Sequence, residues 1–332
     1  MSHLPSTQQL YRVPKKEGIE QLTLHKDEPI PQPNRNQVLV QLKAYSLNFR
    51  DLMVINGHYP SPIENISRPK GFIPLSDASG QVVAIGEDVK EFSIGDRVAG
   101  LFHPDWMDGK HDTPQRGHSL GAGDASSEGV LSQLRIFEKH SLVKIPSYLS
   151  YEEASTLPCA AFTAYHALFQ NIENKVDATQ MVLSFQEFGV DFTIYYKTNP
   201  NWDEKVREFT SGRGVDHVIE VGGVGTLQKS IKATRHGGYI HVVGVLSSFG
   251  QQQTPEPFDF AAAVLRGGVH VRGLSVGSKG MFENMNRLLE NHRIKPVIDQ
   301  VFTFGQAKQA FSHLASQQHF GKIVIVNTEN KP

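Results

Sequence analysis

The sequence has 332 residues, 39% hydrophobic and 9% aromatic, which is enough for two domains with buried cores. The formal net charge of −1 gives no electrostatic basis for binding nucleic acid or an anionic membrane surface. The single cysteine, Cys159, excludes an intrachain disulfide and any site built from several thiolates. No stretch has the pattern of a signal peptide or a membrane span, so we expect a cytoplasmic protein.

The first half of the chain predicts mainly short strands. Residues 37–48, QVLVQLKAYSLN, alternate between apolar and polar side chains, which favours a half-buried strand. A short helix is expected over residues 49–57, where a glycine ends it. Residues 77–102 predict three short strands with turns at Gly86 and Gly95. This succession of short strands suggests a small β-barrel.

A polar stretch over residues 103–129 predicts a loop long enough to have a function of its own. His103, His111 and His118 lie in it without the fixed spacing or helical context of a metal site, so we interpret them as ordinary loop residues. Strands resume over residues 129–146. Ser150 and Glu153 then match a capping box, which predicts the start of a helix.

The second half predicts alternating helices and strands. Residues 156–170 have the apolar periodicity of a helix, in which Cys159 is expected to be an unreactive core residue. Residues 213–248 indicate a strand, a glycine turn, a helix, a glycine turn and a strand. Residues 302–326 predict a closing helix and strand.

Between these segments, residues 170–198 contain one glycine, Gly189, and one strand-like run, MVLSF, over residues 181–185. A phosphate-binding turn needs glycines where the backbone approaches a pyrophosphate, at the start of a helix. A complete strand–helix–strand unit also needs about 30 residues or more. The stretch therefore predicts that such a unit is missing, and we expect a less stable or rearranged sheet as a consequence.

Three segments resemble the medium-chain dehydrogenase/reductase superfamily: residues 36–60, 73–98 and 156–168. Their order and spacing are most similar to the zinc-free branch of quinone oxidoreductase-like and zinc-type alcohol dehydrogenase-like proteins. The resemblance implies an α/β fold with a GroES-like β-barrel catalytic domain over residues 1–152. It also implies a Rossmann-type nucleotide-binding domain over residues 153–298 that lacks its first glycine-rich βαβ unit, and a return to the catalytic domain over residues 299–332.

The resemblance further implies an NAD(P)H-dependent, zinc-independent oxidoreductase that acts on a small carbonyl, quinone or activated alkene. The cofactor is expected to be NADP or NAD, and the residue that selects between them falls in the missing part. Family members suggest a homodimer, with a small-molecule substrate as the only other partner. The alternative is a cofactor-deficient, non-catalytic protein, either a binding module or the product of a splice variant or gene-model truncation.

Zinc-dependent relatives place a cysteine and a Gly-His-Glu where this chain has LNFRD, residues 47–51, and LSDASG, residues 75–80. Asn48 and Ser76 lie near those ligand positions, and neither is a strong zinc ligand. We therefore expect no metal site.

Without zinc, a carbonyl must be polarised by hydrogen-bond donors. By resemblance, Asn48 and Tyr59 are the candidate catalytic residues beside the nicotinamide, and Arg50 is a further possible donor. Asn48 has an alternative role as a helix N-cap, and Tyr59 has an alternative role in packing. Asp51 is interpreted as structural.

By resemblance, the cofactor is expected to contact helix, strand-end and C-terminal positions of the chain. All of these positions also have alternative interpretations. The threonine has one as a helix-contact residue, the glycines and the valine and leucine that follow them have one as strand-end turns, and the lysine has one as a solvated side chain. The candidates are Thr163, Gly222, Gly223, Gly244, Val245, Leu246 and Lys322.

Overall fold

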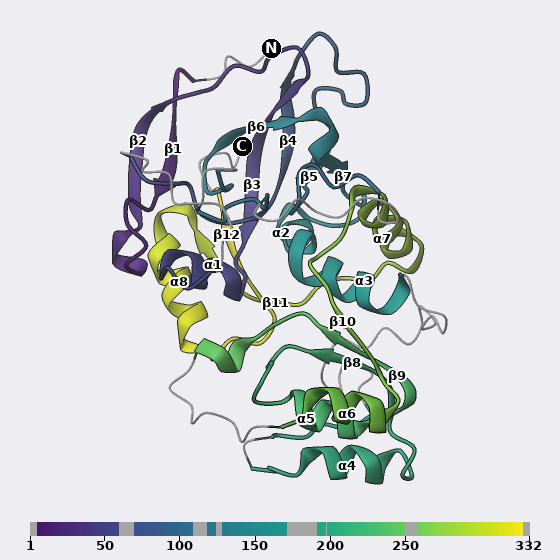
Figure 1. The fold of residues 1–332 in the computed structure, drawn as a ribbon. Coiled ribbons are helices and arrows are strands. Elements are labelled where there is room, and N and C mark those ends of the chain that lie inside the picture. The colour runs from purple at the N-terminus through teal and green to yellow at the C-terminus, as the bar shows by residue number, and fades with distance from the viewer. Residues whose placement is uncertain are drawn as a thin grey trace. The chain divides into compact units, whose positions relative to one another are not determined.

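The computed structural model describes residues 5–59, 70–108, 118–123, 128–170, 191–196, 198–249 and 258–327. The chain divides into two compact units (Figure 1). The first comprises Met1–Phe162 with Val276–Pro332, and the second comprises Thr163–Ser275. Within the described ranges, no helix is long and apolar enough to cross a membrane.

A seven-stranded sheet with the order β11-β12-β3-β4-β5-β7, in which β6 also pairs with β3, forms the centre of the first unit. A separate two-stranded sheet pairs β1 with β2. The bounds are β1 Thr7–Arg12, β2 Thr23–Pro29, β3 Gln37–Ser46, β4 Asp77–Ile85, β5 Arg97–Gly100, β6 Leu134–Glu138, β7 Leu142–Lys144, β11 Ile298–Thr303 and β12 Lys322–Val326.

The prediction of three strands over residues 77–102 is wrong, because only β4 and β5 form there. Val89 and Phe92 lie in the connecting turn, and both are buried in the core of the unit. Their apolar side chains therefore pack inward without a strand partner, which the hydrophobic pattern alone does not distinguish from a strand.

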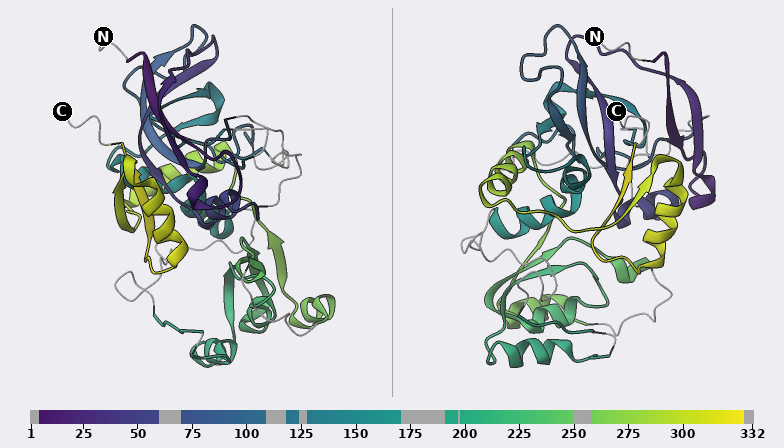
Figure 2. Two further views of the ribbon diagram at one scale, coloured as in Figure 1. Left: turned by 90° about the vertical axis from the view of Figure 1, so that its left-hand side faces the viewer. Right: turned by 180° about the vertical axis from the view of Figure 1, so that it is seen from behind.

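Helices of the first unit cover this sheet. Their bounds are α1 Phe49–Ile55, α2 Tyr151–Ser155, α7 Lys279–His292 and α8 Ala307–Ser316, with a π-helical turn at Leu157–Ala161 and 3-10 turns at Ile19–Gln21, Lys139–Ser141 and Phe304–Gln306. The predicted capping box is confirmed, because Glu153 N donates to Ser150 Oγ (3.1 Å) and Ser150 N donates to Glu153 Oε2 (2.8 Å). In Figure 2, α8 near the chain's end (yellow) lies beside α1 from its beginning (purple).

The limits of the compact units differ from the predicted domain limits. Helix α7 packs in the first unit, where Phe282 stacks on Phe162 with ring centroids 4.8 Å apart. Asn286 Nδ2 also donates to Lys144 O of β7 (2.9 Å). Residues 153–162 and 276–298, predicted as part of the nucleotide-binding domain, thus belong to the unit that contains the β-sheet of the first half.

A three-stranded parallel sheet, in the order β10-β9-β8, forms the second unit. Ile231 of α5 packs on Ile240 and Val218 at one face of this sheet, where α5 and α6 lie in Figure 1. The predicted loss of a βαβ unit concerns residues 170–188, and all of these after Gln170 lie outside the described residues. The bounds are α3 Phe162–Phe169, α4 Trp202–Phe209, β8 Val215–Glu220, α5 Leu227–Ala233, β9 Thr234–Val242, α6 Phe260–Gly267 and β10 His270–Gly273, with a 3-10 turn at Leu246–Phe249.

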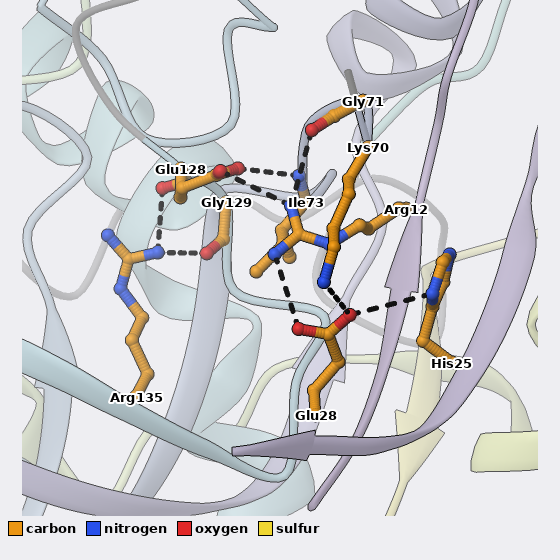
Figure 3. A network of polar contacts seen from close by, with 9 residues as sticks. All are labelled: Arg12, His25, Glu28, Lys70, Gly71, Ile73, Glu128, Gly129 and Arg135. Atoms are coloured by element: carbon orange, nitrogen blue, oxygen red, sulfur yellow. Dashed lines mark hydrogen bonds and ion pairs between the residues drawn. The ribbon is translucent and has the colours of Figure 1, made fainter. Parts of the chain in front are cut away.

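A polar network ties the β1–β2 pair to the rest of the first unit (Figure 3). Arg12 of β1 pairs with Glu28 of β2 at 4.0 Å and with Glu128 at 3.4 Å. Glu128 also accepts a hydrogen bond from the backbone N–H of Ile73 (2.6 Å), just before β4. Partly exposed ion pairs contribute only about 0–1 kcal/mol each, so the network mainly fixes geometry. Its other members are His25, Lys70, Gly71, Gly129 and Arg135.

The face of the second sheet opposite α5 contains a pair formed by the buried His241 and the half-buried His217, in which His217 Nδ1 and His241 Nε2 lie 3.1 Å apart. Burial lowers the pKa of His241 to about 3, and Arg272, His217 and His166 lower it further through their positive charge. In the unfolded chain the imidazole of His241 is protonated below about pH 6.5, whereas in the folded unit it stays neutral down to about pH 3. Protons therefore favour the unfolded state between these two values.

We expect the second unit to lose about 2–4 kcal/mol of stability as the pH falls from 6.5 toward 3, with full stability above pH 6.5. Denaturant unfolding can be followed by Trp202 of α4 in a Trp106→Phe background, because the sequence has only two tryptophans. His241→Leu should flatten the acid-dependent part of the curve. An unchanged slope in that variant would assign the pH dependence to another group.

Candidate functional site

The first candidate site begins where β3 ends and α1 starts. Asn48 has extended backbone angles and is 7% exposed. Its backbone N–H donates to Asp51 Oδ2 (2.8 Å), which supports the N-terminal turn of the helix. This contact gives Asp51 the structural role that the sequence predicts and leaves the side chain of Asn48 for other contacts.

Arg50 connects Asn48 to Tyr59. Its guanidinium pairs with Asp51 at 3.1 Å and donates to the carbonyl oxygen of Leu120 (2.9 Å). The ring of Tyr59 lies over the same guanidinium, 4.7 Å from its carbon to the ring centroid. A cation facing an aromatic ring in this way holds the ring in place. The two predicted catalytic residues therefore belong to one cluster, with Arg50 between them.

Lys322, at the start of β12, reaches the same place from the other end of the chain. Its Nζ donates to Leu47 O (2.7 Å) and to Asn48 Oδ1. An ammonium group can only donate hydrogen bonds, so the oxygen of the Asn48 amide, and not its nitrogen, must face Lys322. Nδ2 of Asn48 is then buried and interacts with the Asp77 carboxylate, although this contact lies outside normal hydrogen-bond geometry.

A buried carboxylate, Asp77, completes the cluster at the start of β4. It accepts hydrogen bonds from Ser76 Oγ (2.6 Å) and from the backbone N–H of Cys159 (3.1 Å). Burial raises the pKa of Asp77 to about 6, and attraction to Lys322 and contact with the Asn48 amide oppose that rise. Its proton affinity is therefore set within the range of physiological pH.

Leu75 shapes the segment that carries Ser76 and Asp77. Its φ angle of 71° lies in the left-handed region, which costs about 1 kcal/mol or more for a residue with a Cβ atom. Strained residues of this kind persist where the surrounding packing imposes them, and Leu75 is fully buried.

Cys159 has a more polar environment than the sequence predicts. Burial raises the pKa of its thiol, and the nearby Asp77 carboxylate raises it further. The group stays a neutral thiol at physiological pH, as expected of an unreactive cysteine. Its surroundings include charged groups, because Asp77, Lys322 and Arg50 all lie close enough to act on its charge.

At the positions where zinc-dependent relatives have ligands, this chain presents Asn48 and Ser76, with the Lys322 ammonium directly against the Asn48 amide. In the part of the chain that the structure describes, no three histidine, cysteine, aspartate or glutamate side chains are placed to hold a metal ion. A zinc-free site stays a prediction that these donor groups favour.

The second candidate site consists of two loops at the carboxyl ends of β8 and β9. Glu220, 3% exposed, accepts hydrogen bonds from Gly223 N (2.8 Å) and Thr226 Oγ1 (2.6 Å) and closes the first loop. Ser247 accepts from Gly225 N (2.9 Å) and donates to Gly222 O (2.6 Å), which fastens the second loop to the first. Ligands of open parallel sheets bind at this edge.

The glycines of these loops are required by the fold itself. Gly223 has a φ angle of 81°, a Cβ on Gly222 would lie 2.3 Å from Thr226 Oγ1, and one on Gly244 would lie 2.6 Å from Val221 O. Val245 and Leu246 point outward, 46% and 39% exposed. The loops thus present an apolar surface, which is consistent with a bound ring but is not specific for one.

The structure places the remaining candidate, Thr163, on α3 in the second unit, where it is half-buried. The predicted residues therefore divide into two groups by unit. Asn48, Tyr59 and Lys322 lie in the first unit, and Thr163, Gly222, Gly223, Gly244, Val245 and Leu246 lie in the second.

The sequence did not indicate Asp77 or Glu220 as members of a site. Both are acidic residues at a strand terminus, Asp77 as the first residue of β4 and Glu220 as the last residue of β8. Buried carboxylates are rare unless they are paired or hydrogen-bonded, so an acidic residue that is buried at a strand terminus is expected to have hydrogen-bond donors around it.

Two family models together match most of the chain. The alcohol dehydrogenase GroES-like domain matches residues 34–147, and the zinc-binding dehydrogenase matches residues 188–325. A zinc-type alcohol dehydrogenase-like protein of Schizosaccharomyces pombe is 34% identical, over 93% of this chain and 96% of its own length. The chain belongs to the medium-chain dehydrogenase/reductase superfamily. The family and the α/β fold class implied by the sequence are thereby confirmed, and the loss of the first βαβ unit stays a prediction.

Two further medium-chain dehydrogenase/reductase proteins define the range of relatives. The quinone-oxidoreductase QR1 of Triphysaria versicolor is 28% identical, over 91% of this chain and 93% of its own length. The solved structure of an NAD-dependent alcohol dehydrogenase has a TM-score of 0.78 and 25% identity, over 97% of this chain and 100% of that one. The fold of this superfamily member is thus shared across both kinds of oxidoreductase.

Proposed function

We propose that this protein is a zinc-independent NAD(P)H-dependent oxidoreductase that reduces a small carbonyl, quinone or activated alkene. The observation that carries the proposal is the buried Asn48 amide, whose oxygen is held by Lys322 and whose Nδ2 makes no hydrogen bond of normal geometry to a described residue, its contact with Asp77 included. Leaving a buried donor unpaired costs about 1–3 kcal/mol, and such a cost is expected where a ligand supplies the acceptor.

The chemistry requires a hydride on carbon and a hydrogen-bond donor on the neighbouring oxygen. The nicotinamide supplies the hydride when it is bound. Asn48 Nδ2 is the proposed donor to the oxygen on which negative charge develops. Tyr59, held by Arg50, is proposed as a second donor or as a gate beside it.

For the cofactor, we propose NADP or NAD on the two loops of the second unit, with contacts from Gly222, Gly223, Gly244, Val245 and Leu246. Thr163 is proposed to lie along the same ligand. A homodimer and a cytoplasmic location remain proposals from the family. The apolar surface of Val245 and Leu246 supports the choice of these loops.

A cofactor-deficient, non-catalytic protein is the second candidate. Residues 170–198 have a single glycine where relatives carry a glycine-rich turn. The alignment with the S. pombe relative spans 341 positions, more than the 332 residues of this chain, so it contains positions that this chain lacks. The alignment length favours a deletion, and the single glycine over residues 170–198 favours its location in the nucleotide-binding part.

Titration with NADPH and NADH, followed by nicotinamide fluorescence, separates the two candidates. The oxidoreductase proposal expects saturable binding in the micromolar range, and reduction of at least one quinone, enone or aldehyde. Absence of binding by protein with a folded circular-dichroism spectrum would support the non-catalytic candidate. Val245→Asp serves as a matched variant, because it places a charge on the proposed surface at an exposed position.

A further inference from the structure

We infer that Lys322 is a positioning residue, which orients the Asn48 amide so that its N–H groups face the reacting oxygen. This inference rests on the proposed function and refines the sequence-based role of Lys322 as a cofactor contact. It concerns the first unit alone, because Asn48, Asp77 and Lys322 all belong to it.

The orientation follows from the contacts of the ammonium. Lys322 Nζ donates to Asn48 Oδ1, and the opposite amide rotamer would set the two N–H donors of Asn48 against three N–H donors of the lysine. The second hydrogen bond, to Leu47 O at 2.7 Å, holds the ammonium in place. Turning Lys322 toward a cofactor would break both contacts.

The backbone delivers the ammonium to this place. Strand β12 pairs antiparallel with β3, with Val324 opposite Ser46, and Lys322 is the first residue of β12. Its side chain therefore starts next to the end of β3, where Leu47 and Asn48 follow. The contact of Lys322 with Leu47 and Asn48 therefore depends on the register of β12 against β3.

The charge of Lys322 also acts on the carboxylate beside the amide. Asp77 is buried and faces Lys322 of β12, Asp51 of α1, Cys159 of the π-helical turn and the amide of Asn48. A negative Asp77 next to the developing oxyanion opposes hydride transfer unless a cation offsets it. Lys322 is that cation, so the site needs both its hydrogen bond and its charge.

The test uses the full chain with three substitutions. Lys322→Met removes the hydrogen bond and the charge, Lys322→Gln keeps a donor without the charge, and Lys308→Met is the control, since Lys308 only meets the exposed Glu20. We expect Lys322→Met to lower kcat by about 10²-fold, as misplacement of a catalytic group by about 1 Å does. The dissociation constant of NADPH should stay within about 2-fold in all three. A large rise in that constant with little change in kcat would instead make Lys322 a cofactor ligand and overturn the inference.

A second readout does not depend on activity. The carboxyl ¹³C signal of Asp77, assigned with Asp77→Asn, is expected to titrate near pH 6 in the parent protein. Lys322→Met and Lys322→Gln should both move that midpoint upward, because each removes the cation that favours the ionised form. An unmoved midpoint would overturn the inference even in an active enzyme. If the pH midpoint of Asp77 moves but the protein reduces no substrate, the arrangement of Lys322 beside Asn48 and Asp77 is upheld and the proposed function is rejected.

Discussion

Replacing Asn48 with alanine is expected to lower kcat by about 10²–10³-fold, the usual effect of removing one hydrogen-bond donor to an oxyanion. The stability of the first unit should change little. The substitution removes a favourable contact with Lys322, but it also removes a buried N–H donor that makes no hydrogen bond of normal geometry. A fall in kcat without a fall in the free energy of unfolding would indicate that Asn48 acts in catalysis and not in stability.

The measurement pairs steady-state kinetics with denaturant unfolding followed by Trp106 of the first unit in a Trp202→Phe background. Asn286→Ala is the matched control. Asn286 is also a buried asparagine of the first unit. Its Nδ2 donates to Lys144 O at 2.9 Å, and its Oδ1, like Nδ2 of Asn48, makes no hydrogen bond of normal geometry to a described residue. This control should lose about 1–2 kcal/mol of stability and keep its kcat. If Asn48→Ala behaves like the control, Asn48 is a structural N-terminal residue of α1.

The sequence predicts the local parts of this cluster well. Asn48 and α1 follow from the end of an alternating strand and the start of a short helix, and both depend on neighbours within four residues. The contact between Lys322 and Asn48 joins residues 274 positions apart. It depends on the pairing of β12 with β3, and periodicity does not show which strands become neighbours.

The glycine-based prediction in the second unit illustrates a different limit. The resemblance predicts that Gly222, Gly223 and Gly244 contact a cofactor. In the structure, each of them is favoured as glycine by a positive φ angle or by the close approach of another residue. A residue that the fold already requires carries little information about a ligand. The exposed Val245 and Leu246 are more informative, because the packing of their own loop does not explain their exposure.

Replacing Glu220 with alanine is expected to destabilise the second unit by about 3–5 kcal/mol. The carboxylate is buried and accepts from Gly223 N, from Thr226 Oγ1 and from Ser230 Oγ, so its removal leaves three donors without their acceptor. Whole domains are stable by only about 5–15 kcal/mol. Because we predict that this unit lacks a strand–helix–strand segment, its stability should lie at the low end of that range, and Glu220→Ala is expected to unfold it in part.

Trp202 fluorescence in the Trp106→Phe background reports the loss, because α4 belongs to the second unit. Glu220→Gln should cost less, since its amide oxygen still accepts from Gly223 N and Thr226. Glu208→Ala is the matched control, an exposed acid of α4 paired only with Lys205 in an exposed ion pair, and should change stability by less than about 0.5 kcal/mol. A transition at the parent's denaturant concentration in Glu220→Ala would show that the loop closes without its carboxylate. Glu220 would then not be the residue that holds the proposed nucleotide surface in place.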